Sequence, residues 1–264
     1  KGRHDPWVTR WAIDTNLAVL SLPLVLLVPW PEPHMWPLFA GMVVIHLAYK
    51  VLQAMAYSRG AYTVVYPVVR GTGPLFTVIG AWLLFGETFT GVQWLGLAVL
   101  LAGIFGLAIY NLVFLVTDRD TLLPALGLAV ATGLFVALYT TYDAYGIRAT
   151  ADPFTFLAWF FFLSALDFPI LMQVTSLKTR LRGLPLRPLL SRGFIGALVA
   201  FGSFGSVMLA TRLDKVGEAA VLRETSTVFA ALIGWLVLRE TVGPRRIALM
   251  CLIALGAVIV EFGG

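Results

Sequence analysis

Residues 56–88 read AYSRGAYTVVYPVVRGTGPLFTVIGAWLLFGET. This apolar stretch is long enough to cross a bilayer, and it carries an arginine, Arg70, near its middle. A second copy, residues 209–241, falls into register without a gap after a shift of 153 positions, from Arg70 to Arg223. A shared apolar composition does not explain matched Arg, Trp and Glu residues, so the sequence predicts an internal duplication. The same shift aligns Val68 with Val221, Thr72 with Thr225, Trp82 with Trp235, Glu87 with Glu240 and Gly103 with Gly256.

The composition is that of a membrane protein. Of the 264 residues, 59% are hydrophobic and 12% are charged, and a soluble domain carries about twice that charge fraction. The net charge of +5 is no argument for a nucleic-acid partner, because most of the basic residues sit in short loops between apolar runs. The one cysteine, Cys251, excludes a disulfide within this sequence and argues against a multi-cysteine metal site. We expect no cofactor and no metal, since P-loop, GxSxG and HExxH motifs are absent from the sequence.

The apolar runs predict an all-α membrane protein with nine visible spanning helices. Each run is near the roughly 20 residues that a bilayer requires, whereas barrel strands are about half as long. Short loops with Pro, Gly and charged residues separate the runs. The predicted spans are residues 7–29, 35–57, 61–86, 91–114, 121–146, 153–175, 189–211, 215–238 and 243–262.

The repeat extends beyond the opening stretch and predicts two inverted five-helix halves. Asp5-Pro6 matches Asp152-Pro153, so the first four spans correspond to the last four, and the fifth span has no visible partner. We therefore expect ten helices in the full protein, with the first one outside this sequence. The predicted repeats are residues 1–114 and 121–264. An odd number of helices per repeat forces the two halves into opposite orientations.

Loop charges test the helix count. Apart from Lys50, Arg70 and Arg223, 13 of the 19 Lys and Arg residues fall on one face when the spans alternate across the membrane, and 3 fall on the other. This asymmetry matches the positive-inside rule and places the loop of residues 176–192 in the cytoplasm. One missed or extra helix would scramble this distribution.

Arg70 and Arg223 are the first candidate site residues. Charged groups deep in spanning helices are costly and usually point into a cavity or at each other. On a helix, Tyr66 and Arg70 share a face with Gly73 and Thr77. The functional interpretation is a bidentate clamp on a carboxylate, phosphonate or phosphate. The structural alternative is that Arg223 pairs with a neighbouring acid and Arg70 caps carbonyls at a helix break made by Pro67 or Pro74.

A polar stripe on span 35–57 forms a second constellation. His46, Lys50, Gln53 and Tyr57 are spaced by 4, 3 and 4 residues, which places them on one helical face among apolar neighbours. Such a stripe is expected to line an interior cavity. The alternative is that Lys50 extends to the membrane surface and His46 bonds a backbone carbonyl.

Acidic residues at membrane depth offer a route to proton coupling. Glu224 follows Arg223 directly, and a titrating acid at that depth would link transport to protons. The alternative is a permanent ion pair between Glu224 and Lys50 or Arg70. Asp14, Asp143 and Asp167 are further acids at membrane depth, and Asp143 lies near a helix end, where it is expected to face water.

Two quoted motifs resemble those of a known family. VVYPVVRGTGPLFTVIGAWLLFGE (64–87) and AAVLRETSTVFAALIGWLVLRE (219–240) resemble the paired motifs of EamA-type transporters in the drug/metabolite transporter superfamily. The branch that this chain resembles is described as a phosphonate-utilisation-associated membrane protein. The resemblance covers essentially the whole chain and implies ten helices around a central cavity. It also implies that Lys50, Arg70, Tyr139, Arg223 and Glu224 lie at or near that cavity.

The functional expectation is a secondary active transporter, and more specifically an exporter, of a small polar metabolite with an anionic group. Candidate substrates are amino acids, phosphonates and organic anions, moved by alternating access. Two alternatives are a translocator of a lipid-linked anion and, with less support, a membrane-embedded enzyme. The expected location is a bacterial inner membrane, as a monomer or homodimer. The predicted substrate-binding set is Arg70, Arg223, Glu224, Lys50, His46, Tyr66, Gln53 and Tyr139, with Glu224 as the candidate for proton coupling.

Overall fold

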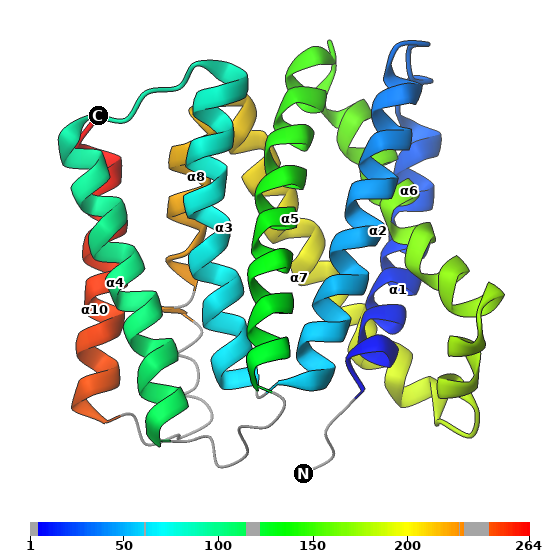
Figure 1. Ribbon diagram of the computed structural model, residues 1–264. Coiled ribbons are helices and arrows are strands. Elements are labelled where there is room, and N and C mark those ends of the chain that lie inside the picture. The colour runs from blue at the N-terminus through cyan, green and yellow to red at the C-terminus, as the bar shows by residue number, and fades with distance from the viewer. Residues whose placement is uncertain (1–4, 61, 115–121, 227, 230–242) are drawn as a thin grey trace. The chain divides into compact units, whose positions relative to one another are not determined.

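The described secondary structure is entirely helical (Figure 1). This computed structural model describes residues 5–60, 62–114, 122–226, 228–229 and 243–264. The all-α prediction is therefore confirmed for these residues. The helices are α1 (Pro6–Leu27), α2 (Met35–Arg59), α3 (Tyr62–Phe85), α4 (Gly91–Phe114), α5 (Leu122–Ala149), α6 (Pro153–Val174), α7 (Leu186–Leu213), α8 (Val216–Arg223) and α10 (Pro244–Phe262), with a short 3-10 helix, η1 (Ser176–Leu181), before α7.

Seven of the described helices, α1 to α7, are long and apolar enough to cross a bilayer, so the chain is a multi-pass membrane protein. Their ends lie within a few residues of the predicted spans. The predicted span 215–238 differs, because α8 ends at Arg223 and a turn occupies Glu224 and Thr225. Most of that span beyond the turn, including Trp235, lies outside the described residues, as does the predicted loop at residues 115–120.

The matched Asp-Pro pairs begin corresponding helices. Asp5 caps α1 by accepting a hydrogen bond from the Trp7 amide at 2.9 Å, and proline fills the first helical position. Asp152 caps α6 in the same way, accepting from the Thr155 amide at 2.9 Å and from the Phe154 amide at 3.1 Å. Proline is suited to this position because its missing amide would have no helical partner there. The same dipeptide thus serves the same purpose at both positions.

Two compact units emerge from the packing of the chain. Unit 1 comprises residues 1–54 and 142–212, and unit 2 comprises residues 55–141 and 213–264. Two of the three divisions fall inside α2 and α5, and the third falls at the last residue of α7. Both units therefore draw on the first and the second half of the sequence. The repeat boundaries at 1–114 and 121–264 stay predictions, because a compact unit and a sequence repeat are different divisions of the chain.

Corresponding helices of the two predicted repeats pack against each other in unit 2. On α4 and α10, Gly96 lies against Val260, and Gly103 lies against Ile253 and Leu249. Since the numbers rise along α4 as they fall along α10, the two helices are antiparallel. A Cβ at Gly103 would lie 2.8 Å from the Leu249 carbonyl oxygen, so glycine permits this close approach.

The helices α3 and α8 are antiparallel as well. Val78 lies beside Gly217, and Arg70 lies beside Glu224, so residue numbers again rise along one helix as they fall along the other. Antiparallel packing of corresponding helices is what inverted repeats require. The helices α1 and α6, which also correspond, pack against each other in unit 1, where the Trp7 and Phe168 rings stack at 5.8 Å.

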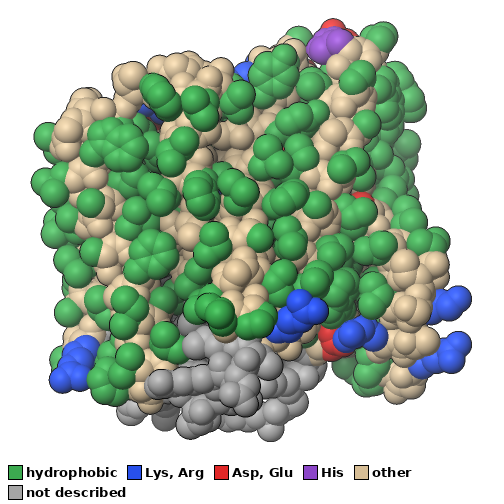
Figure 2. Space-filling view, in the orientation of Figure 1, with side chains coloured by type: hydrophobic (Ala, Val, Ile, Leu, Met, Phe, Trp, Pro, Cys, Tyr) green, Lys and Arg blue, Asp and Glu red, His purple; other side chains and the backbone are tan. Residues whose placement is uncertain are grey.

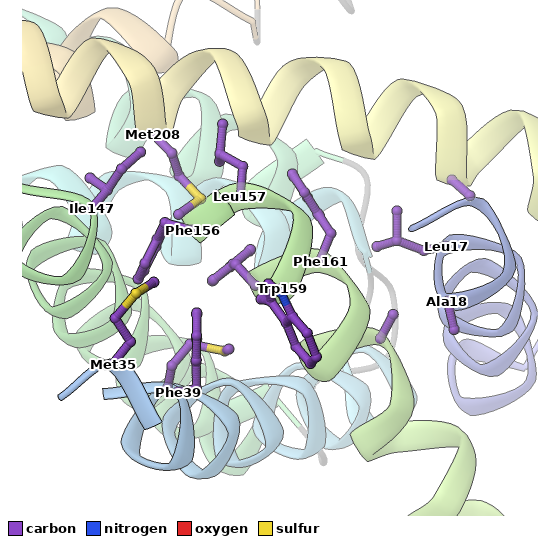
Figure 3. Close-up of a cluster of buried hydrophobic side chains, with 14 residues drawn as sticks. Leu17, Ala18, Met35, Phe39, Ile147, Phe156, Leu157, Trp159, Phe161 and Met208 are labelled. Carbon is purple, nitrogen blue, oxygen red and sulfur yellow. The ribbon is translucent and has the colours of Figure 1, made fainter. Parts of the chain in front are cut away.

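The core of unit 1 is a cluster of aromatic and aliphatic side chains (Figure 3). Phe156, Trp159 and Phe161 of α6 meet Met35 and Phe39 of α2 in this cluster. The rings of Phe39 and Phe156 stack with centroids 5.4 Å apart. Much of the outer surface is also apolar (Figure 2), as expected for helices that face lipid.

Candidate functional site

The two duplicated arginines meet on one carboxylate in unit 2. The Nε atom of Arg70, on α3, lies 3.1 Å from one carboxylate oxygen of Glu224. The Nε atom of Arg223, at the end of α8, lies 3.5 Å from the other oxygen. The Glu224 side chain is 0% exposed. We call these three residues the arginine cluster.

Polar and aromatic neighbours complete the arginine cluster. Arg70 donates a hydrogen bond to the Ser226 hydroxyl, and its guanidinium lies 5.6 Å from the centroid of the Tyr66 ring. Arg223 makes a long contact, 3.5 Å, from Nη1 to the Thr140 hydroxyl on α5. Three helices of unit 2 therefore contribute to the cluster.

The arginine cluster carries one more positive than negative charge. Its two guanidinium groups and one carboxylate give a formal charge of +1. The Arg223 side chain is only 10% exposed, and its Nη2 atom has no hydrogen-bond partner among the described residues. A buried donor without a partner is costly, so this geometry favours a bound acceptor group.

A tightened turn places Arg223 and Glu224. The Glu224 amide bonds the Val221 carbonyl and the Thr225 amide bonds the Leu222 carbonyl, each at 3.0 Å and each three residues back. Such a 3-10 stretch inside a helical run often marks a hinge. The alternative in which Pro67 or Pro74 breaks this helix is wrong, because α3 runs through both prolines without interruption.

A second buried ion cluster lies in unit 1 around Lys50. Its ammonium lies 2.7 Å from Asp167 and 3.1 Å from Asp14, and it also donates to the Ser164 carbonyl. Arg10 pairs with Asp14 at 3.0 Å. With two positive and two negative groups, this lysine cluster is formally neutral. Lys50 is 2% exposed, so it does not extend to the membrane surface.

His46 and Gln53 also bond to side chains inside unit 1. The Nε2 atom of His46 lies 2.8 Å from the carboxylate of Asp143 on α5. The imidazole packs edge-on against the Phe160 ring at 5.1 Å. Gln53 donates to the Tyr49 hydroxyl at 2.6 Å. The expectation that Asp143 faces water is wrong, since its side chain is 2% exposed and is held by His46.

The predicted site residues therefore fall into two groups. Arg70, Arg223, Glu224 and Tyr66 come together in unit 2, while Tyr139, which is buried on α5 of the same unit, precedes Thr140. The other three, His46, Lys50 and Gln53, lie in unit 1.

Two acids of the lysine cluster, Asp14 and Asp167, were predicted from the sequence only as acids at membrane depth. Asp14 and Asp167 are related by the same 153-position shift that relates Arg70 to Arg223. Both contact the same ammonium group. The signal was present in the sequence, but the Asp-Pro match favours a different register for the first span.

A third acid that sequence reasoning did not assign is Glu87. Its two carboxylate oxygens accept the Val216 and Gly217 amides at 2.9 and 3.1 Å, which caps α8. An acid at a helix N-terminus satisfies amides that have no helical partner. Within the described ranges, no group of three His, Cys, Asp or Glu side chains could hold a metal ion.

Comparisons with known proteins agree with this architecture. The model of the EamA-like transporter family matches residues 6–109 and 123–262. "Uncharacterized protein y4nH" of Sinorhizobium fredii (strain NBRC 101917 / NGR234) is 36% identical over 77 residues, 29% of this chain. That match spans 66% of the relative's length, just under two thirds. A solved structure described as "Crystal structure of protein" has a TM-score of 0.76 at 16% identity, over 100% of this chain and 91% of the other, which is a likeness of fold alone.

Proposed function

Because the chain belongs to the EamA-like transporter family, we propose that it is a secondary active transporter that exports a small polar metabolite bearing an anionic group. The observation that carries this proposal is the pairing of Arg70 and Arg223 on Glu224, which gives these three largely buried side chains a formal charge of +1. One anionic group would neutralise it. A guanidinium binds carboxylates and phosphonates through two parallel hydrogen bonds, so the substrate class follows from the donors.

Glu224 is the internal counterion in this mechanism. When the site is empty, its carboxylate holds both arginines in place, since each guanidinium faces one of its oxygens. A substrate anion would supply an acceptor for the Nη2 donor of Arg223, which has no hydrogen-bond partner among the described residues. The anion therefore binds beside Glu224 and is not required to displace it.

Export driven by protons would further require a positive group on the substrate. Protonation of Glu224 alone raises the charge of the cluster to +2 and strengthens the binding of an anion, so proton and anion would travel together. A substrate ammonium that pairs with Glu224 competes with the proton instead, and this competition is what an exchanger needs. The geometry thus favours a zwitterion, such as an amino acid or an aminophosphonate, over a simple organic anion.

The tightened turn at Glu224 and Thr225 supplies a place for movement. Transporters with inverted repeats form their sites from discontinuous helices near the membrane midplane, and the repeats rock about the site. Here the interruption of α8 immediately follows the arginine that would bind substrate. A change at this turn would shift Arg223 and Glu224 together, which opens or closes the site in one step.

A thermal-stability screen of the purified protein tests the proposal. Alanine, aminomethylphosphonate and succinate represent the three substrate classes. At a concentration of about 100 times Kd, a ligand stabilises the fold by about 2.7 kcal/mol, which raises Tm by roughly 5–10 °C. We expect a zwitterion to give the largest rise.

Matched variants separate the site from general effects. Arg223→Gln should abolish the rise while leaving Tm without ligand measurable. Arg245→Gln removes an exposed arginine of α10 that stacks on Phe114, so it should leave the rise unchanged. An undiminished rise in Arg223→Gln would refute the assignment of the site.

A further inference from the structure

A pocket in unit 1 is separate from both ion clusters. It has a volume of about 430 Å³ and lies among the N-terminal end of α1, the η1 region and the first turns of α7. These are the ends of helices that are long and apolar enough to span a bilayer. Its lining residues are Asp5, Val8, Thr9, Ala12, Ile13, Arg180, Leu184, Pro185, Pro188, Leu189, Arg192 and Gly193.

The pocket combines an apolar wall with two arginines. Val8, Ile13 and Leu189 are typical of the wall, while Arg180 and Arg192 supply positive charge. Arg180 is fixed in position, because it pairs with Asp5 at 2.6 Å and lies 5.7 Å from the centroid of the Trp7 ring. With Asp5 as the one acid of the lining, the pocket has a formal charge of +1.

The surrounding segment adds further positive charge. Besides Arg180 and Arg192, residues 176–192 contain Lys178, Arg182 and Arg187 and no acid, and these three side chains are also exposed. Figure 2 shows Lys and Arg side chains gathered over the segment between α6 and α7, at the lower right of the view. Basic clusters next to spanning helices attract the headgroups of anionic lipids, and basic pockets between such helices hold them.

We propose that this pocket binds an anionic phospholipid, with its phosphate on Arg180 and Arg192 and the first part of an acyl chain along the apolar wall. A free phosphate would use the two arginines but would leave the wall of Val8, Ile13 and Leu189 without a partner. The exposed apolar side chains of Leu184, Leu186 and Phe194 at the same end of α7 also suit contact with lipid. A lipid on α1 and α7 would bridge two helices of one unit and stabilise it.

The test measures Tm of the full chain in detergent micelles with added phosphatidylglycerol, phosphatidylcholine or inorganic phosphate. We expect phosphatidylglycerol to raise Tm, while the other two additions at equal concentration give little change. Arg192→Gln should weaken the response to phosphatidylglycerol about fivefold in the concentration required. Arg182→Gln removes an exposed arginine of the same segment outside the pocket lining, so it should have a much smaller effect.

A variant that does not change the charge distinguishes binding in the pocket from attraction of lipid to the charged surface. Pro188→Trp fills the pocket from its exposed side without a change in charge, and we expect it to reduce the response to phosphatidylglycerol. Three results would overturn the proposal. They are an equal response to phosphatidylcholine, an equal response to inorganic phosphate, and equal losses in Arg192→Gln and Arg182→Gln. None of these measurements depends on the transported substrate.

Discussion

Replacing Lys50 with methionine tests whether the lysine cluster is needed for the stability of unit 1. The change keeps a long flexible side chain but removes the ammonium that joins α2 to α1 and α6. Asp14 retains its ion pair with Arg10, at 3.0 Å. Asp167 loses the partner 2.7 Å away, and its second oxygen has no hydrogen-bond partner among the described residues. The damage is therefore concentrated on one buried carboxylate.

The magnitude follows from two independent estimates. Removing one partner of a buried ion pair typically costs about 3–5 kcal/mol. The stranded carboxylate escapes the full cost of burial by taking up a proton. Protonating an ordinary aspartate at pH 7 costs about 4 kcal/mol, given a pKa of about 3.9 in water and 1.36 kcal/mol per pH unit. Both estimates predict a loss of about 4 kcal/mol, which lowers Tm by roughly 10 °C.

Thermal unfolding in detergent micelles measures this loss, and three comparisons make it decisive. Lys178→Met removes an exposed lysine and should change Tm little. Adding Asp167→Asn to Lys50→Met should restore most of the stability, because it removes the stranded charge. The defect should also shrink as pH falls toward 4. A Lys50→Met protein as stable as Lys178→Met would refute the reasoning, as would a failure of Asp167→Asn to restore stability.

Three further outcomes follow from individual contacts. Glu224→Gln should abolish the dependence of transport on a pH gradient if the proton binds there, and an unchanged dependence in proteoliposomes would place coupling elsewhere. Gly256→Ala should lower the free energy of unfolding by about 1–3 kcal/mol, since the new alanine Cβ would lie 2.6 Å from the Gly96 carbonyl oxygen. Gly127→Ala is the control, because there is open space around Gly127. Asp152→Ala should cost about 1 kcal/mol at pH 7 by loss of the α6 cap. The hydrogen bond from the Thr155 hydroxyl lowers the pKa of Asp152. The stabilisation by this carboxylate is therefore fully present above its ordinary pKa of 3.8 and is lost as the pH falls through the lowered pKa. Unfolding measured at several pH values would follow this loss.

Much of the fold was accessible from the sequence because lipid imposes a simple rule. Every backbone group in hydrocarbon must bond within its own helix, so a long apolar run is a helix and the flanking Pro, Gly and charged residues mark its ends. The duplication then predicted which helices correspond. Packing within unit 2 agrees, since Gly103 and Gly256 serve the same helix pair.

The site was only partly accessible, because pairing depends on tertiary contacts. Sequence reasoning selected Arg70, Arg223 and Glu224, but it left open whether Glu224 would pair with Arg70 or with Lys50. The structure pairs Glu224 with both arginines, and it gives Lys50 to Asp14 and Asp167. The spacing of residues along a helix predicts the face on which a side chain lies. It does not predict which oppositely charged side chain of a neighbouring helix will contact it.

Two structural details could not be predicted from the sequence, for different physical reasons. The interruption at Glu224 and Thr225 involves neither glycine nor proline, so no local signal marks it. The burial of Asp143 depends on His46, which is 97 residues away in the sequence. A position near a helix end suggested contact with water, but a partner across the helix pair changed the outcome.

The central claim is that two duplicated arginines recognise one anionic group. Its most direct test is uptake, into proteoliposomes, of the labelled zwitterion that gives the largest rise in Tm. We predict that Arg70→Gln and Arg223→Gln each abolish uptake, while Arg245→Gln transports like the unmodified protein. Uptake at the normal rate by both site variants would contradict the account.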